Sequence, residues 1–126
     1  TDAPIQVLLC GHMDTVYDEH HSFQTPILLD ENTINGPGVA DMKGGLIVML
    51  YGLLAFEQTP WAEKIGFEII INPDEEIGSY GSASLLAEAG KRNHVGLVFE
   101  PAMHPDGTLA GERKGSGNFI VVAHGK

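Results

Sequence analysis

A strongly β-forming run that leads directly into three consecutive carboxylates constrains this chain more than any other feature. Residues 67–71 (Phe-Glu-Ile-Ile-Ile) predict a buried strand, and residues 72–78 (Asn-Pro-Asp-Glu-Glu-Ile-Gly) follow it at once. In open α/β sheets, ligands bind beyond the carboxyl ends of the strands, which is where these acids lie. Neighbouring side chains on an extended backbone point in alternate directions, so Glu75 and Glu76 are expected to have two different roles. A solvated acidic turn is the alternative interpretation.

The composition favours a soluble globular domain and excludes two classes of partner. The chain has 126 residues, of which 43% are hydrophobic, which is enough for one domain with a core. Its formal net charge is -10, and its seven Lys and Arg residues form no cluster. Such a chain is a poor ligand for nucleic acid or for an anionic membrane surface, so neither is expected as a partner.

The single cysteine and the first residues bear on the cellular compartment. Cys10 lies in an apolar run, where the expected role is that of a small buried hydrophobe. Residues 1–4 contain no basic segment followed by an apolar core, so no signal peptide is visible. These features predict a cytoplasmic protein, with the periplasm as the alternative. The longest apolar run, residues 46–56, is too short to span a bilayer and predicts a buried helix.

The first predicted strand leads into a pattern typical of metal sites. Residues 5–10 predict a strand covered on both faces, and His12 and Asp14 follow it. These two residues are two apart, so their side chains share one face of an extended segment. A metal-bound imidazole needs this arrangement if a carboxylate is to hold its second ring nitrogen. A histidine satisfied within the fold is an equal alternative on this pattern alone.

A glycine-rich loop follows a predicted surface hairpin. Residues 25–36 contain two short apolar runs around a polar turn, which predicts the hairpin. Residues 36–45 (Gly-Pro-Gly-Val-Ala-Asp-Met-Lys-Gly-Gly) predict a loop that runs into a helix starting near Met42. Asp41 lies at the junction, where capping of the helix is the alternative to a role in a site. The four glycines predict that the backbone packs closely against another part of the molecule.

Strands and helices alternate along the chain, and acids recur at strand ends. Residues 79–90 predict a short helix with serines at its cap and a closing glycine, and residues 95–99 predict another strand. This order predicts the α/β class with a largely parallel sheet and right-handed crossovers. One edge of the sheet is then expected to hold a histidine and several acids: His12, Glu75, Glu76 and Glu100.

Four segments together resemble one family of enzymes. In chain order they are residues 11–17 (Gly-His-Met-Asp-Thr-Val-Tyr), residues 36–45, residues 72–79 (Asn-Pro-Asp-Glu-Glu-Ile-Gly-Ser) and residues 99–101 (Phe-Glu-Pro). They resemble the successive motifs of the co-catalytic zinc exopeptidase and deacylase family, which includes carboxypeptidase G, acetylornithine deacetylase, succinyl-diaminopimelate desuccinylase and the aminoacylases. The first and third motifs are most similar to the glutamate carboxypeptidase branch. The resemblance covers nearly the whole chain in the correct order.

The resemblance implies a fold and a reaction. It implies part of a three-layer αβα sandwich in a zinc-dependent metallopeptidase or amidohydrolase. Such an enzyme cleaves an amide bond at a peptide C-terminus or in an N-acyl amino acid, here of glutamate type. Two zinc ions are implied per active site, which cobalt or manganese could replace. The substrate would be a small peptide or N-acyl amino acid, and the enzyme would be a homodimer.

The resemblance also implies a set of metal ligands. His12 and Glu100 would bind one zinc ion, Asp41 would bridge the two ions, and Glu76 would bind the second. Imidazole and carboxylate donors suit zinc, and a bridging carboxylate can hold two metals about 3.5–4 Å apart. A cis peptide bond is implied between Asp41 and Met42.

Two further residues receive roles by the same resemblance. Glu75 would be the general base that takes a proton from the attacking water and returns it to the leaving amine. Asp14 would orient His12 through its second ring nitrogen.

Two parts of the family pattern are missing from these residues, namely a downstream zinc-binding histidine and a lid domain that contributes another. Residues 113–117 and 119–126 resemble the hinge and first strand of that lid. We therefore expect the metal-binding part of the catalytic domain at 1–113, and a truncated lid and dimerisation domain at 114–126. His124 lies in the expected strand and is predicted to be structural. The chain is expected to be an internal fragment with a weak second zinc site and no hydrolytic activity of its own.

Two other functions stay open at this stage. A non-catalytic metal-binding module on the same scaffold would be favoured if the whole gene lacks the downstream histidine. A phosphoacceptor receiver domain shares the size, acidity and α/β order, but it needs an acid pair after its first strand and a lysine after its last. Here the acid pair follows a later strand, and Lys43 opens a helix.

Overall fold

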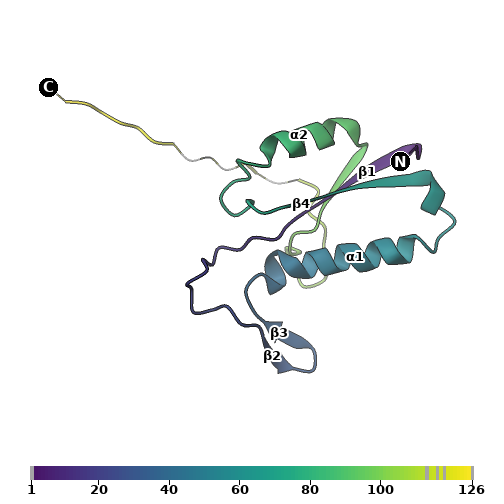
Figure 1. Ribbon diagram of the computed structural model, residues 1–126, viewed down its shortest axis with the longest axis horizontal. Helices are drawn as coiled ribbons and strands as arrows, with labels where there is room; N and C mark the ends of the chain where they lie inside the picture. Colours follow the sequence, from purple (N-terminus) through teal and green to yellow (C-terminus); the bar gives the residue numbers. More distant parts are fainter. Residues whose placement is uncertain (1, 113, 116, 118, 126) are drawn as a thin grey trace.

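Strand β1 is the central element of the sheet (Figure 1). The computed structural model describes residues 2–112, 114, 115, 117 and 119–125. In it β1 (Ile5–His12) pairs in parallel with β4 (Ile65–Asn72) on one side and with β5 (Val95–Val98) on the other. The register places His12 opposite Asn72, so the carboxyl ends of β1 and β4 lie at the same edge. The predicted parallel sheet is confirmed.

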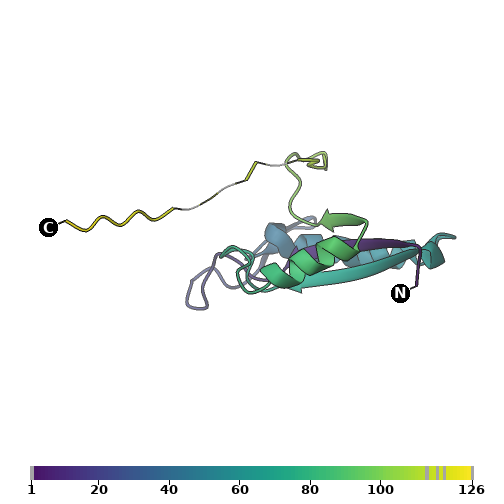
Figure 2. The ribbon, with the colours of Figure 1, turned by 90° about the horizontal axis from the view of Figure 1, so that it is seen from above.

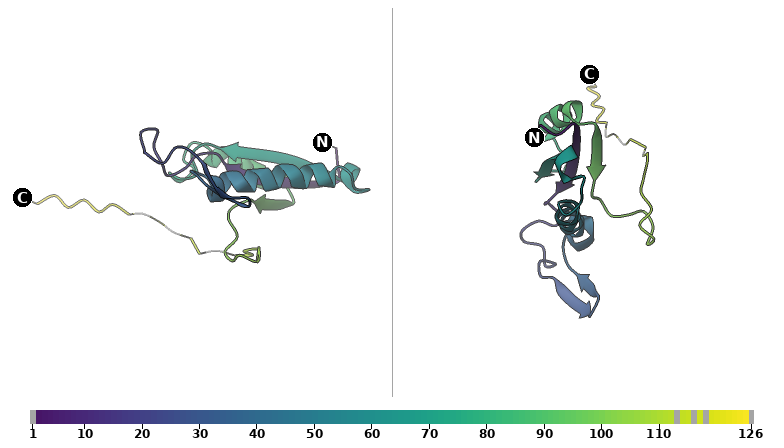
Figure 3. Two further views of the ribbon diagram at one scale, coloured as in Figure 1. Left: turned by 90° about the horizontal axis from the view of Figure 1, so that it is seen from below. Right: turned by 90° about the vertical axis from the view of Figure 1, so that its right-hand side faces the viewer.

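One helix covers each face of the sheet, which gives three layers (Figures 1 and 3). The helices are α1 (Gly44–Phe56) and α2 (Ala83–Arg92). Alternate residues of β1 face opposite sides, as the period of a strand requires. Val7 and Leu9 pack against α1, whereas Leu8 packs against α2. The predicted α/β class and αβα layering are therefore confirmed.

The predicted hairpin is also present and lies apart from the sheet (Figure 1). It consists of β2 (Ile27–Asp30) and β3 (Thr33–Asn35), which pair antiparallel with all their residues exposed. A short 3-10 turn, η2 (Ala62–Lys64), precedes β4. Neither element contributes to the core clusters of buried residues.

Both predicted helices begin later than expected. The segment before α1 is a distorted π-helical turn, η1 (Val39–Lys43), in which Asp41 and Met42 have non-helical dihedral angles. The peptide bond between these two residues is cis, as the resemblance implied. The second helix begins after Ser82, whose side chain makes no capping bond, and it continues through Gly90 to Arg92. The predicted serine cap and closing glycine are therefore wrong.

Helix α1 is mostly exposed, so the prediction of a buried helix is wrong. Met49 is its only buried residue, whereas Val48 and Tyr51 are 63% and 68% exposed. The sheet covers one side of the helix, and no other described element packs on the opposite side. The apolar segment Val39–Phe56 is long enough in residues to cross a membrane, but only the 13 residues of α1 are a regular α-helix. At about 1.5 Å per residue, α1 is shorter than the roughly 30 Å core of a bilayer.

The C-terminal segment extends away from the sheet (Figure 2). Residues 119–125 are exposed, and none of them is assigned to a strand. His124 is exposed, and the lid strand expected at residues 119–126 stays a prediction. Arg113 and Ser116 of the predicted hinge lie outside the described residues. The division into 1–113 and 114–126 stays a prediction.

Gly45 allows α1 to approach the end of β5 closely. A Cβ atom built on Gly45 would lie 1.8 Å from the backbone carbonyl oxygen of Phe99, which no side chain could tolerate without backbone movement. By contrast, a Cβ atom on Gly52 of the same helix would meet no atom within 4 Å. Cβ atoms built on Gly36, Gly38 and Gly44 would also come within 2.8, 2.6 and 2.6 Å of other residues, so the predicted close packing of the clustered glycines is confirmed.

Gly45 and Gly52 predict opposite effects of the same substitution on stability. Gly45→Ala should destabilise the fold by about 1–3 kcal/mol, the usual cost of forced backbone shifts in a packed region. Gly52→Ala should stabilise it by about 0.5–1 kcal/mol, because alanine is the better helix former. Urea unfolding of both variants measures these free energies. Equal effects of the two substitutions would contradict the assigned contact.

Candidate metal centre

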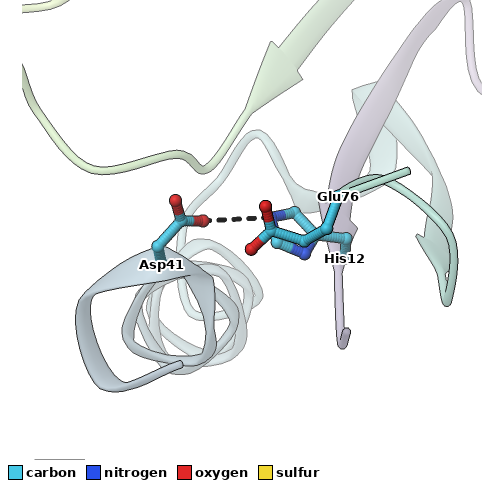
Figure 4. Close-up of side chains that lie close together, drawn as sticks. All are labelled: His12, Asp41 and Glu76. Atoms are coloured by element: carbon cyan, nitrogen blue, oxygen red, sulfur yellow. Dashed lines mark hydrogen bonds and ion pairs between the residues drawn. The ribbon is translucent and has the colours of Figure 1, made fainter. Parts of the chain in front are cut away.

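His12 lies at the centre of the site and is only 1% exposed (Figure 4). Its Nδ1 atom is 3.1 Å from the carbonyl oxygen of Asp14 and 3.2 Å from the carboxylate oxygen Oδ1 of the same residue. A carbonyl oxygen can only accept a hydrogen bond, so Nδ1 carries a proton. In the neutral imidazole, Nε2 then presents its lone pair to the acids on the other side, which is the form that binds a metal.

Carboxylates from three other segments surround Nε2 of His12. Asp41 Oδ1 is 3.0 Å away, Glu100 Oε1 is 3.6 Å away and Glu75 Oε2 is 3.8 Å away. Ligand atoms of His12, Asp41 and Glu76 also lie within 4.8 Å of one another. A second such group consists of His12, Glu75 and Glu100. The structure therefore brings all the predicted site residues together at one edge of the sheet.

Asp14 joins the end of β1 to the segment of residues 74–82 that follows β4, which we call the acidic turn. Its Oδ2 atom accepts a hydrogen bond from the backbone N–H of Glu76 at 3.0 Å, and its Oδ1 atom lies beside His12. Hydrogen bonds from backbone N–H groups, first that of Glu76, outweigh burial and hold the pKa of Asp14 below its usual value. Asp14 therefore stays ionised and lies beside His12, as predicted.

The expected orientation of Glu75 is wrong in one respect. Because neighbouring side chains alternate along an extended backbone, we expected Glu75 and Glu76 to point in different directions. Both instead reach toward His12, although the Glu75 side chain is 47% exposed. Alternation requires an extended backbone, but residues 75–78 form a turn two residues beyond the end of β4. A turn can bring consecutive side chains to one side.

Proton affinities within the cluster reflect its crowding. Burial and then the neighbouring Asp41 carboxylate raise the pKa of Glu76 and of Glu100 above the ordinary value. Burial by itself would lower the pKa of His12, but Glu100 and Asp41 outweigh it, so the pKa of His12 is raised. Glu76, Glu100 and His12 therefore hold protons more tightly than they would in an unfolded chain.

The donor set fits a divalent cation. It consists of one imidazole nitrogen and four carboxylates, the donors that zinc and harder divalent metals accept. Within the described residues, no Lys or Arg forms an ion pair with these acids, and Lys43 Nζ donates to the carbonyl oxygen of Met13 instead. A bound cation would offset both the burial and the repulsion by Asp41 that raise the pKa of Glu76 and of Glu100.

The sequence of this chain matches a protein family over a range that includes the whole site. The family is described as peptidase family M20/M25/M40, and its pattern matches residues 8–117. The chain belongs to this family. The match includes all the site residues, from His12 in β1 to Glu100 after β5.

Relatives similar to this chain include a carboxypeptidase, a probable desuccinylase and a deacetylase by their names. Carboxypeptidase G2 from Pseudomonas sp. (strain RS-16) is 36% identical over 86% of this chain and 25% of its own length. A probable succinyl-diaminopimelate desuccinylase from Staphylococcus epidermidis is 32% identical over 98% of the chain and 31% of its own length. Acetylornithine deacetylase from Photorhabdus laumondii is 32% identical over 81% of the chain and 27% of its own length.

The chain therefore spans about a quarter to a third of the length of these relatives. No solved structure matches the chain significantly. These relatives are hydrolases by their names.

Sequence reasoning missed two contacts that shape the site. The backbone N–H of His12 faces the sulfur of Met42 at 3.1 Å, and Met42 is fully buried. The carboxylate of Asp74, to which no role was assigned, bonds to the far end of the acidic turn. An Asp followed by glycine and serine is typical of side-chain bonds to nearby backbone, and this signal could have indicated the second contact.

The pKa directions predict that the metal-free protein loses stability as the pH rises. The ordinary values are 4.5 for Glu76 and Glu100 and 6.5 for His12, and all three are raised in the folded state. Their stabilising contribution is fully present below the ordinary values and is lost as the pH rises through the raised ones. We expect the melting temperature to fall between about pH 5 and pH 8.

Zinc should reverse this dependence, because metal binding requires deprotonated ligands. Glu100→Gln should flatten the pH profile of the metal-free protein, since it removes one of the titrating groups. Asp14, whose pKa is lowered, makes stability fall as the pH decreases, but only below about pH 4, which is outside this window. A melting temperature that rises steadily with pH in the metal-free protein would contradict the assigned directions.

Proposed function

We propose that this chain carries the metal centre of a di-zinc amidohydrolase of the M20 family. His12, Asp41 and Glu100 would hold one zinc ion, and Asp41 and Glu76 would hold the second. The convergence of carboxylates from three segments on Nε2 of one buried histidine is the observation that carries this proposal.

Each residue would then have a defined part in amide hydrolysis. Bound zinc supplies Lewis-acid chemistry and an acidified water. Glu75 takes a proton from the attacking water and returns it to the leaving amine nitrogen, and its partial exposure leaves room for substrate beside it. Asp14 keeps the proton on Nδ1 of His12, so that Nε2 stays free to bind metal.

The proposed substrate is a small peptide or an N-acyl amino acid, of glutamate type. The likeness to carboxypeptidase G2 and to two deacylases supports this class. A pocket of about 260 Å³ beside Asp41 and Glu76 supports a binding place next to the metal ligands, and Tyr17 and Phe23 line its other side. A cytoplasmic homodimer is the proposed form of the whole enzyme.

Substitution of the two neighbouring glutamates separates catalysis from metal binding. In the whole protein, Glu75→Gln should lower kcat for an N-acyl glutamate by roughly 10²–10⁴, the usual contribution of a general base. It should leave calorimetric zinc binding nearly unchanged. Glu76→Gln should weaken the binding of one zinc ion, because it removes a ligand. Glu63→Gln, an exposed acid in η2 at the opposite end of β4, is the matched control.

The outcomes distinguish the proposal from its alternative. Two zinc ions bound without any hydrolysis by the whole protein would favour a non-catalytic metal module on the same scaffold. Failure of the wild-type protein to bind zinc would overturn the proposed metal centre. Equal activity of the Glu75→Gln and Glu63→Gln variants would exclude Glu75 as the base.

A further inference from the structure

Asp74 is the first residue of the acidic turn (residues 74–82), and both oxygens of its carboxylate accept hydrogen bonds from that turn or from Asn72 just before it. Its Oδ1 atom accepts hydrogen bonds from Asn72 Nδ2 at 3.2 Å and from the hydroxyl of Ser82 at 2.6 Å. Its Oδ2 atom accepts from the backbone N–H groups of Gly81 at 2.6 Å and Ser82 at 3.1 Å. Neither oxygen is directed at the cluster around His12.

These bonds join the two ends of the acidic turn. Asp74 begins the turn, and its side-chain partners Gly81 and Ser82 end it, directly before α2. Its own carbonyl oxygen also accepts from the N–H of Ser79 at 2.7 Å. Glu75 and Glu76 lie inside the loop that these contacts close, so their positions depend on its shape.

The backbone of the acidic turn needs such support. Gly78 has a φ of 99°, and Ser79 has a φ of 53°, a region that residues other than glycine rarely adopt. Glycine tolerates this conformation, but serine adopts it only where surrounding contacts enforce it. The hydrogen bonds of Asp74 with Ser79, Gly81 and Ser82 are contacts that can enforce this conformation.

The same network connects the acidic turn to the sheet. Asn72 is the last residue of β4 and is buried, and it lies opposite His12 in the register. Besides Asp74, its side-chain amide donates to the hydroxyls of Ser79 and Ser82. Its carbonyl oxygen accepts from the N–H of Met13 at 2.9 Å. The turn is thus fixed to the strand ends that carry the histidine.

We propose that Asp74 is a positioning residue, which holds the acidic turn in the shape that brings Glu75 and Glu76 to His12. This inference rests on the proposed function, because its effect on metal and substrate follows from the roles given to the two glutamates. Asp74 acts through the turn, because its carboxylate bonds to Asn72, Gly81 and Ser82, none of which is a proposed metal ligand.

The test compares Asp74→Ala with Ser82→Ala and with the control Asp30→Ala in the whole protein. Asp30 also accepts a backbone N–H in a turn, that of Asn32 at 2.8 Å, but it lies in the hairpin away from the site. Asp74→Ala should weaken zinc binding at the Glu76 site by about 10–100-fold, the usual effect of losing a residue that supports ligands. At saturating zinc, kcat for an N-acyl glutamate should fall while KM is unchanged.

Ser82→Ala separates hydrogen bonding from charge. It removes the 2.6 Å bond to Asp74 and leaves the carboxylate charge in place, so it should shift zinc affinity in the same direction by a smaller factor. If Asp74→Ala fails to fold, this variant decides the question alone. Folded Asp74→Ala or Ser82→Ala protein with the zinc affinity and kcat of Asp30→Ala would overturn the proposal.

Amide hydrogen exchange in the metal-free protein tests the positioning role without reference to catalysis. Exchange of residues 75–81 should become faster in Asp74→Ala and stay unchanged in Asp30→Ala. A wild-type protein that binds no zinc would overturn the proposed function, and exchange would still report on Asp74. Unchanged exchange in the acidic turn would overturn the positioning role.

Discussion

A buried imidazole whose two nitrogens both need partners determines how the other segments of the site are arranged. Nδ1 of His12 meets Asp14, and Nε2 meets Asp41 at 3.0 Å. Asp14 in turn holds the backbone N–H of Glu76 with its second carboxylate oxygen. One side chain at the end of the central strand thereby fixes the distance between η1 and the acidic turn. Because β1 is paired on both sides, this reference point is carried by the best-supported strand of the described chain.

The sequence was sufficient to predict the parallel sheet and to predict which residues lie together in the site. Runs of β-branched residues bounded by polar ones indicated β1, β4 and β5, and their alternation with helices indicated parallel order. Polar residues at the ends of parallel strands meet at one edge whatever the details of packing, which is why His12, Glu76 and Glu100 could be placed together. The roles assigned to them by resemblance are a separate matter and stay predictions.

What could not be predicted depends on contacts between distant segments or on what covers a surface. The late start of α1 follows from the irregular backbone at Asp41 and Met42, where Met42 is buried against β1. The apolar sequence of α1 predicts a hydrophobic helix, but it does not predict how many sides of that helix are covered by other elements. Glu75 and Glu76 do not alternate because the backbone leaves the extended conformation directly after β4, where Asp74 and its partners hold it in a turn.

The four predicted ligands come from four segments that are far apart in the sequence, and this spacing has a topological consequence. Two cations bridged by Asp41 and held also by His12, Glu76 and Glu100 would together close three loops of tens of residues each. Closing such loops in a flexible chain costs entropy that rises only slowly with their length. The two bound cations would then act as a reversible cross-link in a chain whose single cysteine, Cys10, cannot form an internal disulfide. In such a protein a chelator would act on the fold in the way that a reductant acts on a disulfide-bonded one.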